Sequence, residues 1–128
     1  MPTFPVVTGD VLTSTIFNGL PAFTVQTAKT ADYTAASGDE YQQLIPMNKA
    51  TAVAFKIPVD ATYNFPVGTV ITVLNIGAGT CTISAVTPGT TTILSSGAVA
   101  ASPTLAQYKT AVCIKTAANA WYVVGAIA

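Results

Sequence analysis

The chain has 128 residues, enough for one domain, and its 51% hydrophobic content excludes intrinsic disorder because it allows a core to be buried. Only 8% of the residues are charged, against about 25% in an average soluble domain, and five lysines balance five carboxylates to a net charge of +0. Without arginine or a run of lysines, binding to nucleic-acid phosphates is not expected. The low charge also indicates that part of the surface does not face water, although composition does not show what it faces.

Residues 1–30 are predicted to form an extended N-terminal arm. Pro2 and Pro5 oppose a helix at its start, whereas Thr13 is a suitable N-cap for one or two helical turns that Gly19 and Pro21 would end. The arm either packs back on its own domain or docks on another subunit. The candidate partner-binding residues are its large apolar side chains, Phe4, Val6, Val7, Leu12, Ile16, Phe17 and Leu20.

Residues 31–128 are predicted to form one compact β domain. From Phe23 onward the apolar pattern has a period of two, and turn residues separate the runs. Strands are expected over Phe23–Lys29, Asp32–Ala35, Tyr41–Met47, Ala52–Pro58, Val70–Ile76, Thr80–Val86, Thr91–Ser95, Gln107–Thr116 and Ala120–Ala126. Many short strands without a later helical period predict an all-β fold, an antiparallel β-sandwich or jelly roll with an N-terminal arm.

Two hairpins are predicted within this domain. Gly77 and Gly79 supply the conformational freedom of a tight reversal, so strand 70–76 should pair with strand 80–86. The second hairpin joins the last two strands across residues 117–120. Alternation places Cys113 in the same row as Lys109 and Lys115, which argues against deep burial of this cysteine.

Several rows of these strands are apolar or threonine on both sides. Strand 70–76 has largely apolar or threonine residues on both faces, whereas an antiparallel sheet normally has one polar, hydrated face. One face has Val70, Thr72, Leu74 and Ile76, and the other has Ile71, Val73 and Asn75. Such two-sided strands suit packing against copies of the same chain. The single tryptophan, at position 121, is expected in the core rather than as a platform for a sugar.

The chain offers few groups for catalysis or metal binding. It has no histidine, and Cys81, Cys113 and the five carboxylates lack the spacing of zinc or calcium sites. The adjacent acids Asp39 and Glu40 fit a solvated polar turn better than an acid–base pair. No nucleophile with a base, phosphate loop or C-x-x-C motif is found. We therefore expect no enzyme activity, no cofactor and no metal.

Compartment signals are equally sparse. The first residues have neither the positive nor the apolar region of a secretory signal, so reduced cysteines are the default, although a Cys81–Cys113 disulfide remains possible. Residues 61–108 carry no charge, but prolines and glycines interrupt them every few residues. No window reaches the length of a membrane-spanning helix, and no membrane partner is expected.

Several segments resemble structural proteins of tailed-bacteriophage virions. Residues 9–21, GDVLTSTIFNGLP, resemble an opening segment of these proteins. Most of the remaining chain resembles the β domain of phage tail fibres and virion-surface proteins. The motifs that carry this resemblance are Ala31–Thr34, Leu44–Asn48, Phe65–Val73, Gly77–Thr80, Thr82–Ile83 and Ala106–Tyr108, with Ala111, Ile114, Lys115 and Trp121 in the last element.

An arm followed by a single β domain, without a fibre shaft, looks more like a capsid decoration (cement) protein than a complete fibre. The resemblance implies a virion protein, assembled in the host cytoplasm, that binds the major capsid protein on the capsid surface and associates with itself as a homotrimer or a dimer. The alternative is a tail-fibre or head-fibre tip that binds a host-surface glycan or receptor. The candidate platform for that role is aromatic: Tyr33, Tyr41, Tyr63 and Tyr122.

Overall fold

The computed structural model describes residues 25–41 and 44–128. Most of the predicted arm, including all seven of its candidate binding residues and its helical turn, lies outside the described residues. Residues 25–41 and 44–128 form strands and loops, and they contain no helix. The all-β class is therefore confirmed.

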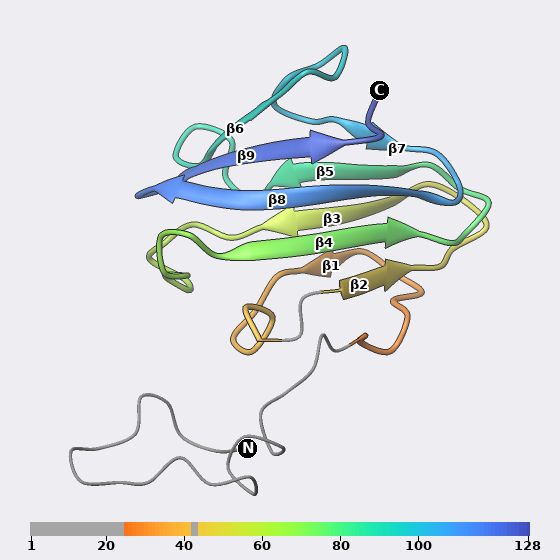
Figure 1. The fold of residues 1–128 in the computed structure, drawn as a ribbon, viewed down its shortest axis with the longest axis horizontal. Coiled ribbons are helices and arrows are strands. Elements are labelled where there is room, and N and C mark those ends of the chain that lie inside the picture. The colour runs from red at the N-terminus through yellow and green to blue at the C-terminus, as the bar shows by residue number, and fades with distance from the viewer. Residues whose placement is uncertain (1–24, 42–43) are drawn as a thin grey trace, which may run out of the picture.

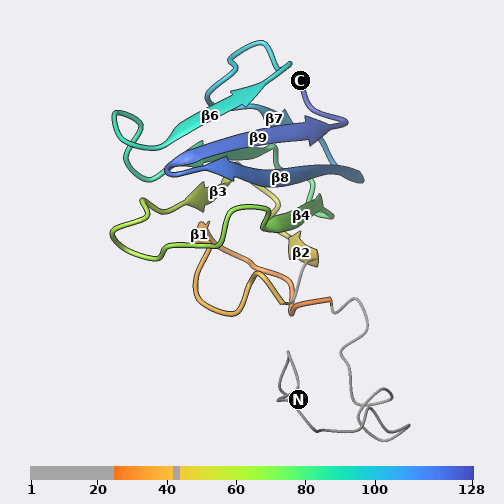
Figure 2. The same ribbon diagram turned by 60° about the vertical axis from the view of Figure 1, so that its left-hand side comes forward.

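The strands form two sheets that lie one against the other (Figures 1 and 2). The five-stranded sheet has, in spatial order, β2 (Leu44–Met47), β4 (Val70–Asn75), β8 (Lys109–Ala117), β9 (Ala120–Gly125) and β6 (Thr92–Ser95). The four-stranded sheet has, in spatial order, β1 (Tyr33–Thr34), β3 (Val53–Ile57), β5 (Cys81–Ala85) and β7 (Thr104–Leu105). The two layers are consistent with a β-sandwich.

Both sheets are mixed rather than antiparallel. The pairs β1–β3, β3–β5, β2–β4 and β6–β9 are parallel, and the pairs β4–β8, β8–β9 and β5–β7 are antiparallel. The prediction of an antiparallel sheet is thus wrong for much of the domain, and the jelly-roll topology is not confirmed. Periodicity reports which residues share a face of a strand, and it carries no information on the direction of the neighbouring strand.

Three of the four parallel pairs, β1–β3, β2–β4 and β3–β5, arise because successive segments cross from one sheet to the other and stack in register. β2 leads into β3, and β4 leads into β5, so that the second crossing lies directly on the first. An earlier segment continues the stack, because Val25 and Lys29 bridge to Leu44 and Met47 of β2 before the chain enters β1. Of the predicted strand Phe23–Lys29, only these two isolated bridges are seen in the described part.

The first predicted hairpin is wrong. β4 and β5 belong to different sheets, and the loop between them is an arch from one layer to the other. A Cβ atom on Gly77 would collide with the backbone of Lys49, and one on Gly79 with the backbone of Thr51. These glycines therefore allow close stacking of two arches, since only a residue without a side chain fits there.

The buried Asn75 fixes the same arch from within. Its Nδ2 donates to the carbonyl oxygens of Gly79 at 2.8 Å and Leu105 at 2.9 Å, and its Oδ1 accepts from the Gly77 N–H at 3.1 Å. The second predicted hairpin, β8–β9, is confirmed, with Asn119 at a φ of 49° in its turn. The two-residue strand β7 was not predicted.

The core lies between the two sheets. Its largest fully buried apolar side chains are Ile45, Met47, Phe55, Ile57, Phe65, Ile71, Val73, Ile83, Leu105, Trp121 and Val123. Trp121 meets Phe65 edge to face, with 5.7 Å between ring centroids, so its predicted core position is confirmed. The strand residues that alternate with these point outward and form the two outer faces of the domain.

Candidate interaction surface

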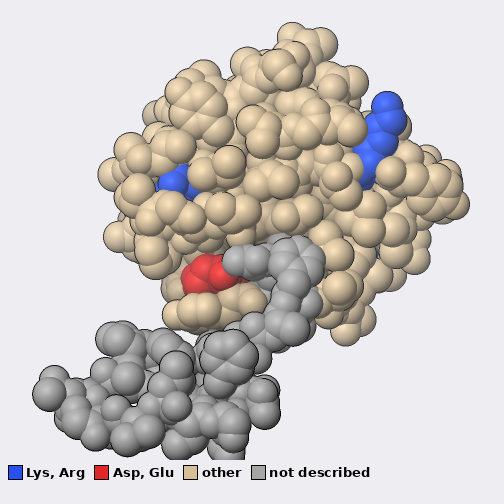
Figure 3. Space-filling model, viewed as in Figure 1, with Lys and Arg blue, Asp and Glu red and all other residues tan. Residues whose placement is uncertain are grey.

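The outward residues of the five-stranded sheet form a surface that we call the apolar face. Its large apolar members are Leu44, Val70, Leu74, Leu94, Val112, Ile114, Tyr122 and Val124, with Thr72 and Thr110 between them. None of these described residues is charged. Figure 3 views the molecule from this side, and its coloured, charged atoms lie away from the centre of the face.

Strand register gathers these side chains into continuous rows. Ile114 of β8 is paired with Val70 of β4 on one side and with Tyr122 of β9 on the other. Leu94 of β6 extends the row from Tyr122. A second row runs beside it through Thr72, Val112 and Val124. Neighbouring side chains on one face of a sheet lie in contact range, so the rows make a contiguous patch.

The patch is open to solvent in the isolated chain. Leu94, Tyr122 and Val124 are 44%, 46% and 47% exposed, and Ile114 and Val112 are half-buried. Large contiguous apolar patches are rare on the surface of monomeric proteins, and they often mark sites of contact with another protein. This exposed apolar face is therefore a candidate contact surface.

The outer face of the four-stranded sheet is different. Its outward residues are small or polar: Thr34 of β1, Ala54 and Lys56 of β3, and Thr82 and Ser84 of β5. Hydroxyl groups and an ammonium group are well hydrated. This face has the composition of an ordinary water-facing sheet.

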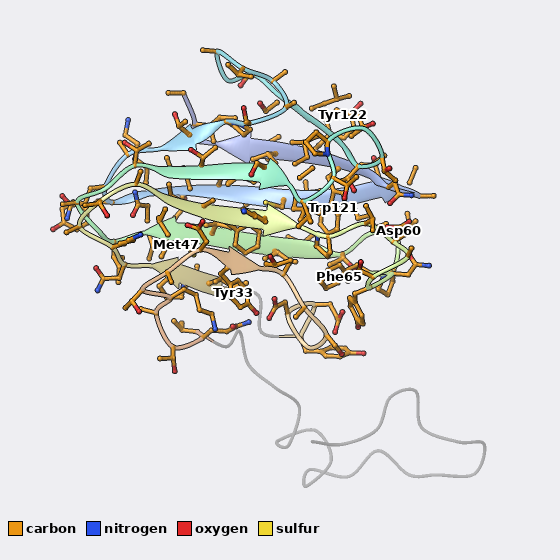
Figure 4. The ribbon with its side chains drawn as sticks, turned by 180° about the vertical axis from the view of Figure 1, so that it is seen from behind. Tyr33, Met47, Asp60, Phe65, Trp121 and Tyr122 are labelled. Atoms are coloured by element: carbon orange, nitrogen blue, oxygen red, sulfur yellow. The ribbon has the colours of Figure 1, made fainter. Side chains whose placement is uncertain are left out.

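One lysine of the five-stranded sheet, Lys115, is buried inside the domain and does not lie on the apolar face. Lys115 of β8 is 1% exposed, and its Nζ donates to Asp60 Oδ1 at 2.7 Å, Asn64 Oδ1 at 2.8 Å and the Phe65 carbonyl at 2.7 Å. All three ammonium protons are thereby used. Figure 4 shows Asp60, Phe65 and Trp121 at the same end of the domain.

The row of β8 that holds Lys115 is the buried one, which corrects the expectation for Cys113. Ala111 and Cys113 are fully buried beside it, whereas Val112 and Ile114 point outward. The sequence assigned the lysine row to solvent because lysine is rarely buried without a partner. That partner, Asp60, lies 55 residues away in the chain.

Asp60 ties this end of the domain together. Its Oδ2 accepts from the Asn119 N–H at 2.9 Å, while its own N–H donates to Asn119 Oδ1 at 2.8 Å. Partial burial acts to raise the pKa of Asp60, but the hydrogen bonds from Lys115 and the Asn119 backbone, with the lysine charge, outweigh it and lower that pKa. The carboxylate is thus a structural acceptor.

Asp39 and Glu40 lie in a turn, as predicted, but Asp39 is not solvated. It is 4% exposed and accepts hydrogen bonds from the Tyr33 hydroxyl at 2.8 Å, the Ala36 N–H at 2.8 Å and Gln26 Nε2 at 2.7 Å. Burial and this carboxylate raise the pKa of Tyr33. The acidic pair therefore organises the turn.

The four tyrosines proposed as a platform do not form one. The hydroxyls of Tyr33 and Tyr63 are engaged with Asp39 and Glu40, the second at 2.8 Å. Tyr41 is exposed at the same turn, whereas Tyr122 belongs to the apolar face. Figure 4 shows Tyr33 and Tyr122 on opposite sides of the domain.

Both cysteines are buried as free thiols. Burial raises the pKa of Cys81 to about 11 and that of Cys113 to about 12, so neither is a reactive thiolate at neutral pH. Within residues 25–41 and 44–128, no three His, Cys, Asp or Glu side chains are grouped so that they could hold a metal ion. No helix in the same residues is long and apolar enough to cross a membrane.

The sequence prediction placed the binding residues in the arm and did not select the apolar face as a site. The signal was present, because the outward row of strand 70–76 is apolar or threonine and Tyr122 alternates with Trp121. What was missing was the order of the strands, which brings Val70, Ile114 and Leu94 into one patch. Comparison of the chain with protein-family models, with curated proteins and with solved structures found no match.

Proposed function

We propose that this protein is a capsid decoration (cement) protein of a tailed bacteriophage, which acts by binding and not by catalysis. In this proposal the N-terminal arm binds the major capsid protein of the assembled head, and the β domains associate with one another on the capsid surface. The proposal combines the sequence resemblance with the described surface of the domain.

The observation that carries the proposal is the apolar face in a chain with 8% charged residues. A free monomer normally keeps such a face covered or interrupts it with charge. In a protein that functions within an assembly, the partner covers the apolar face, so no charge is required on it. The uncharged face therefore supports an assembly role over that of a solitary binding module.

The mechanism is mechanical. A protein that binds only the assembled shell stabilises it by mass action, because dissociation of the shell must also release the bound protein. Several arms in one oligomer multiply weak individual contacts through their high effective concentration. The arm residues that would make these contacts are Phe4, Val6, Val7, Leu12, Ile16, Phe17 and Leu20.

The described carboxylates support a non-enzymatic role because each accepts a hydrogen bond within the fold. Asp39, Glu40 and Asp60 are engaged as described above, and Asp32 accepts from the Ala54 N–H at 2.9 Å. A catalytic acid or base has to reach a substrate, whereas these groups hold turns and loops to neighbouring segments.

The alternative function, a fibre tip that binds a glycan, is supported less well. It needs aromatic side chains gathered beside free polar groups. The structure separates Tyr122 from Tyr33 and engages the hydroxyls of Tyr33 and Tyr63 internally.

The proposal is tested by adding the labelled full-length chain to assembled heads that lack it. We expect wild-type protein to coat the heads and raise their melting temperature. A Phe4→Ser/Phe17→Ser variant should lose most of this binding, because the substitutions remove apolar anchors from the arm. Tyr41→Ser removes an exposed aromatic side chain outside the arm and serves as the matched control, which should bind like wild type.

Two results would contradict the proposal. If the arm variant coats heads as well as wild type, the arm is not the anchor. If the labelled wild-type protein, added to whole tailed particles in place of heads, is found at tail tips and not on heads, the fibre-tip function replaces the cement function.

A further inference from the structure

We infer that the apolar face is the surface through which copies of this chain associate, its occupant being the same face of a second copy. This inference rests on one part of the proposed function, the association of the β domains with one another, and it names the surface that makes the contact. It does not depend on binding to the capsid. The inference starts from what the face would accept as a partner.

The face selects an uncharged partner. A charged side chain pressed against Ile114, Val112 and their neighbours would lose its hydration, and no described residue of the face carries a compensating charge. An average protein surface is rich in charge, so most of it is a poor match. The equally uncharged surface known to be present wherever this chain is present is the same face of another copy.

The dimensions agree with such a contact. Five strands at about 4.8 Å spacing and about six residues at about 3.3 Å each give a face of about 24 Å by about 20 Å, or about 500 Å² in plan. Side chains that stand above the sheet increase the accessible area further. Specific interfaces bury about 600 to 1,000 Å² on each partner, so the face is of the size that a stable contact requires.

The composition also agrees with a sheet that packs on another sheet. The central rows contain β-branched and aromatic residues, namely Val70, Ile114, Val112, Tyr122 and Val124. These are the residue types that fill the interior between packed sheets, which lie about 10 Å apart. The small and polar outer face of β1, β3 and β5 has no comparable row, so it should remain in water.

The experiment measures the molar mass of the full-length chain by sedimentation over a range of concentrations. Wild type should be a dimer, because a face that packs on the same face of a second copy is covered by that one partner. Leu94→Lys and Tyr122→Lys each place an ammonium group on an exposed position of the face, and each should raise the dissociation constant at least about tenfold by burying or opposing charge. Circular dichroism should remain that of the folded wild-type protein.

The matched controls place the same charge on the other outer face. Thr82→Lys and Ser84→Lys should leave the dissociation constant unchanged, because β5 faces water in the assembly. A monomeric wild-type protein would overturn the inference. So would controls that dissociate the protein while the Leu94 and Tyr122 variants do not.

The competing explanation is that the N-terminal arm joins the copies, and the experiment distinguishes it from contact through the apolar face. If Phe4→Ser/Phe17→Ser makes the protein monomeric while Leu94→Lys leaves it assembled, the arm and not the apolar face joins the copies, and the inference is wrong. Failure of the proposed function looks different, because a chain that assembles through the face and does not bind heads contradicts only the capsid proposal.

Discussion

The two outer faces of this domain are built on the same kind of strand and yet face different surroundings. The outward residues of β3 and β5 are mainly small or polar, and those of β4, β8 and β9 are mainly large and apolar. The inward residues of both sheets are alike, because both line one core. The shared core therefore does not account for the difference between the outer faces, and the proposed self-association accounts for it by a contact that only the apolar face makes.

This comparison depends on the orientation of β8. A shift of one residue would bring Lys109 and Lys115 to the outer face and turn the apolar row inward. In the structure, Lys115 is buried on Asp60, whereas Lys109 is exposed at the start of the strand. The two lysines thus provide a direct test of which row faces out.

The largest expected effect is that of Lys115→Ala. We expect it to lower the free energy of unfolding by about 3 kcal/mol, because it leaves Asp60 and the Phe65 carbonyl without their buried donor. The expected cost lies at the low end for a broken buried pair, since Asp60 remains partly hydrated. The matched control is Lys109→Ala, which should change the free energy of unfolding by less than about 0.5 kcal/mol. Urea denaturation measures both variants. Equal effects would mean that the row of β8 has been assigned to the wrong face.

A second substitution tests whether β4 and β5 belong to different sheets. Gly79→Ala should destabilise the domain by about 2 kcal/mol, because the added methyl group would meet the Thr51 backbone of the arch below. Gly89→Ala has open space around its added methyl group and should change stability by less than about 0.5 kcal/mol. Thermal unfolding monitored by circular dichroism compares the two. A harmless Gly79→Ala would favour a hairpin over an arch and would undo the assignment of the two faces.

The sequence predicts strands well because alternation is a local property. Eight of the nine predicted strands overlap the observed ones, and the face assignment of Trp121 and Tyr122 follows from the same alternation. The short β7 carries too few residues to show any period. Its pairing with β5 depends on residues distant in the chain.

The local residue pattern could not predict to which of the two sheets each strand belongs. The glycines at 77 and 79 fit a tight turn and a stacked arch equally well until Lys49 and Thr51 are placed beside them. Burial of Lys115 depended on an acid 55 positions away, and burial of Asp39 depended on Tyr33 and Gln26. The apolar face was hidden for the same reason, because four separate strands contribute its central row.

The most direct test of the central claim compares the chemical accessibility of the two faces. A thiol introduced by Leu94→Cys lies on the apolar face, and one introduced by Thr34→Cys lies on the other. Because Cys81 and Cys113 are buried, the introduced thiols dominate the reaction with a maleimide probe. We predict that the Leu94→Cys thiol is protected at concentrations at which the protein is assembled and becomes reactive on dilution, while the Thr34→Cys thiol reacts at one rate throughout. Equal, concentration-independent labelling at both positions would contradict the claim that a second copy covers the apolar face.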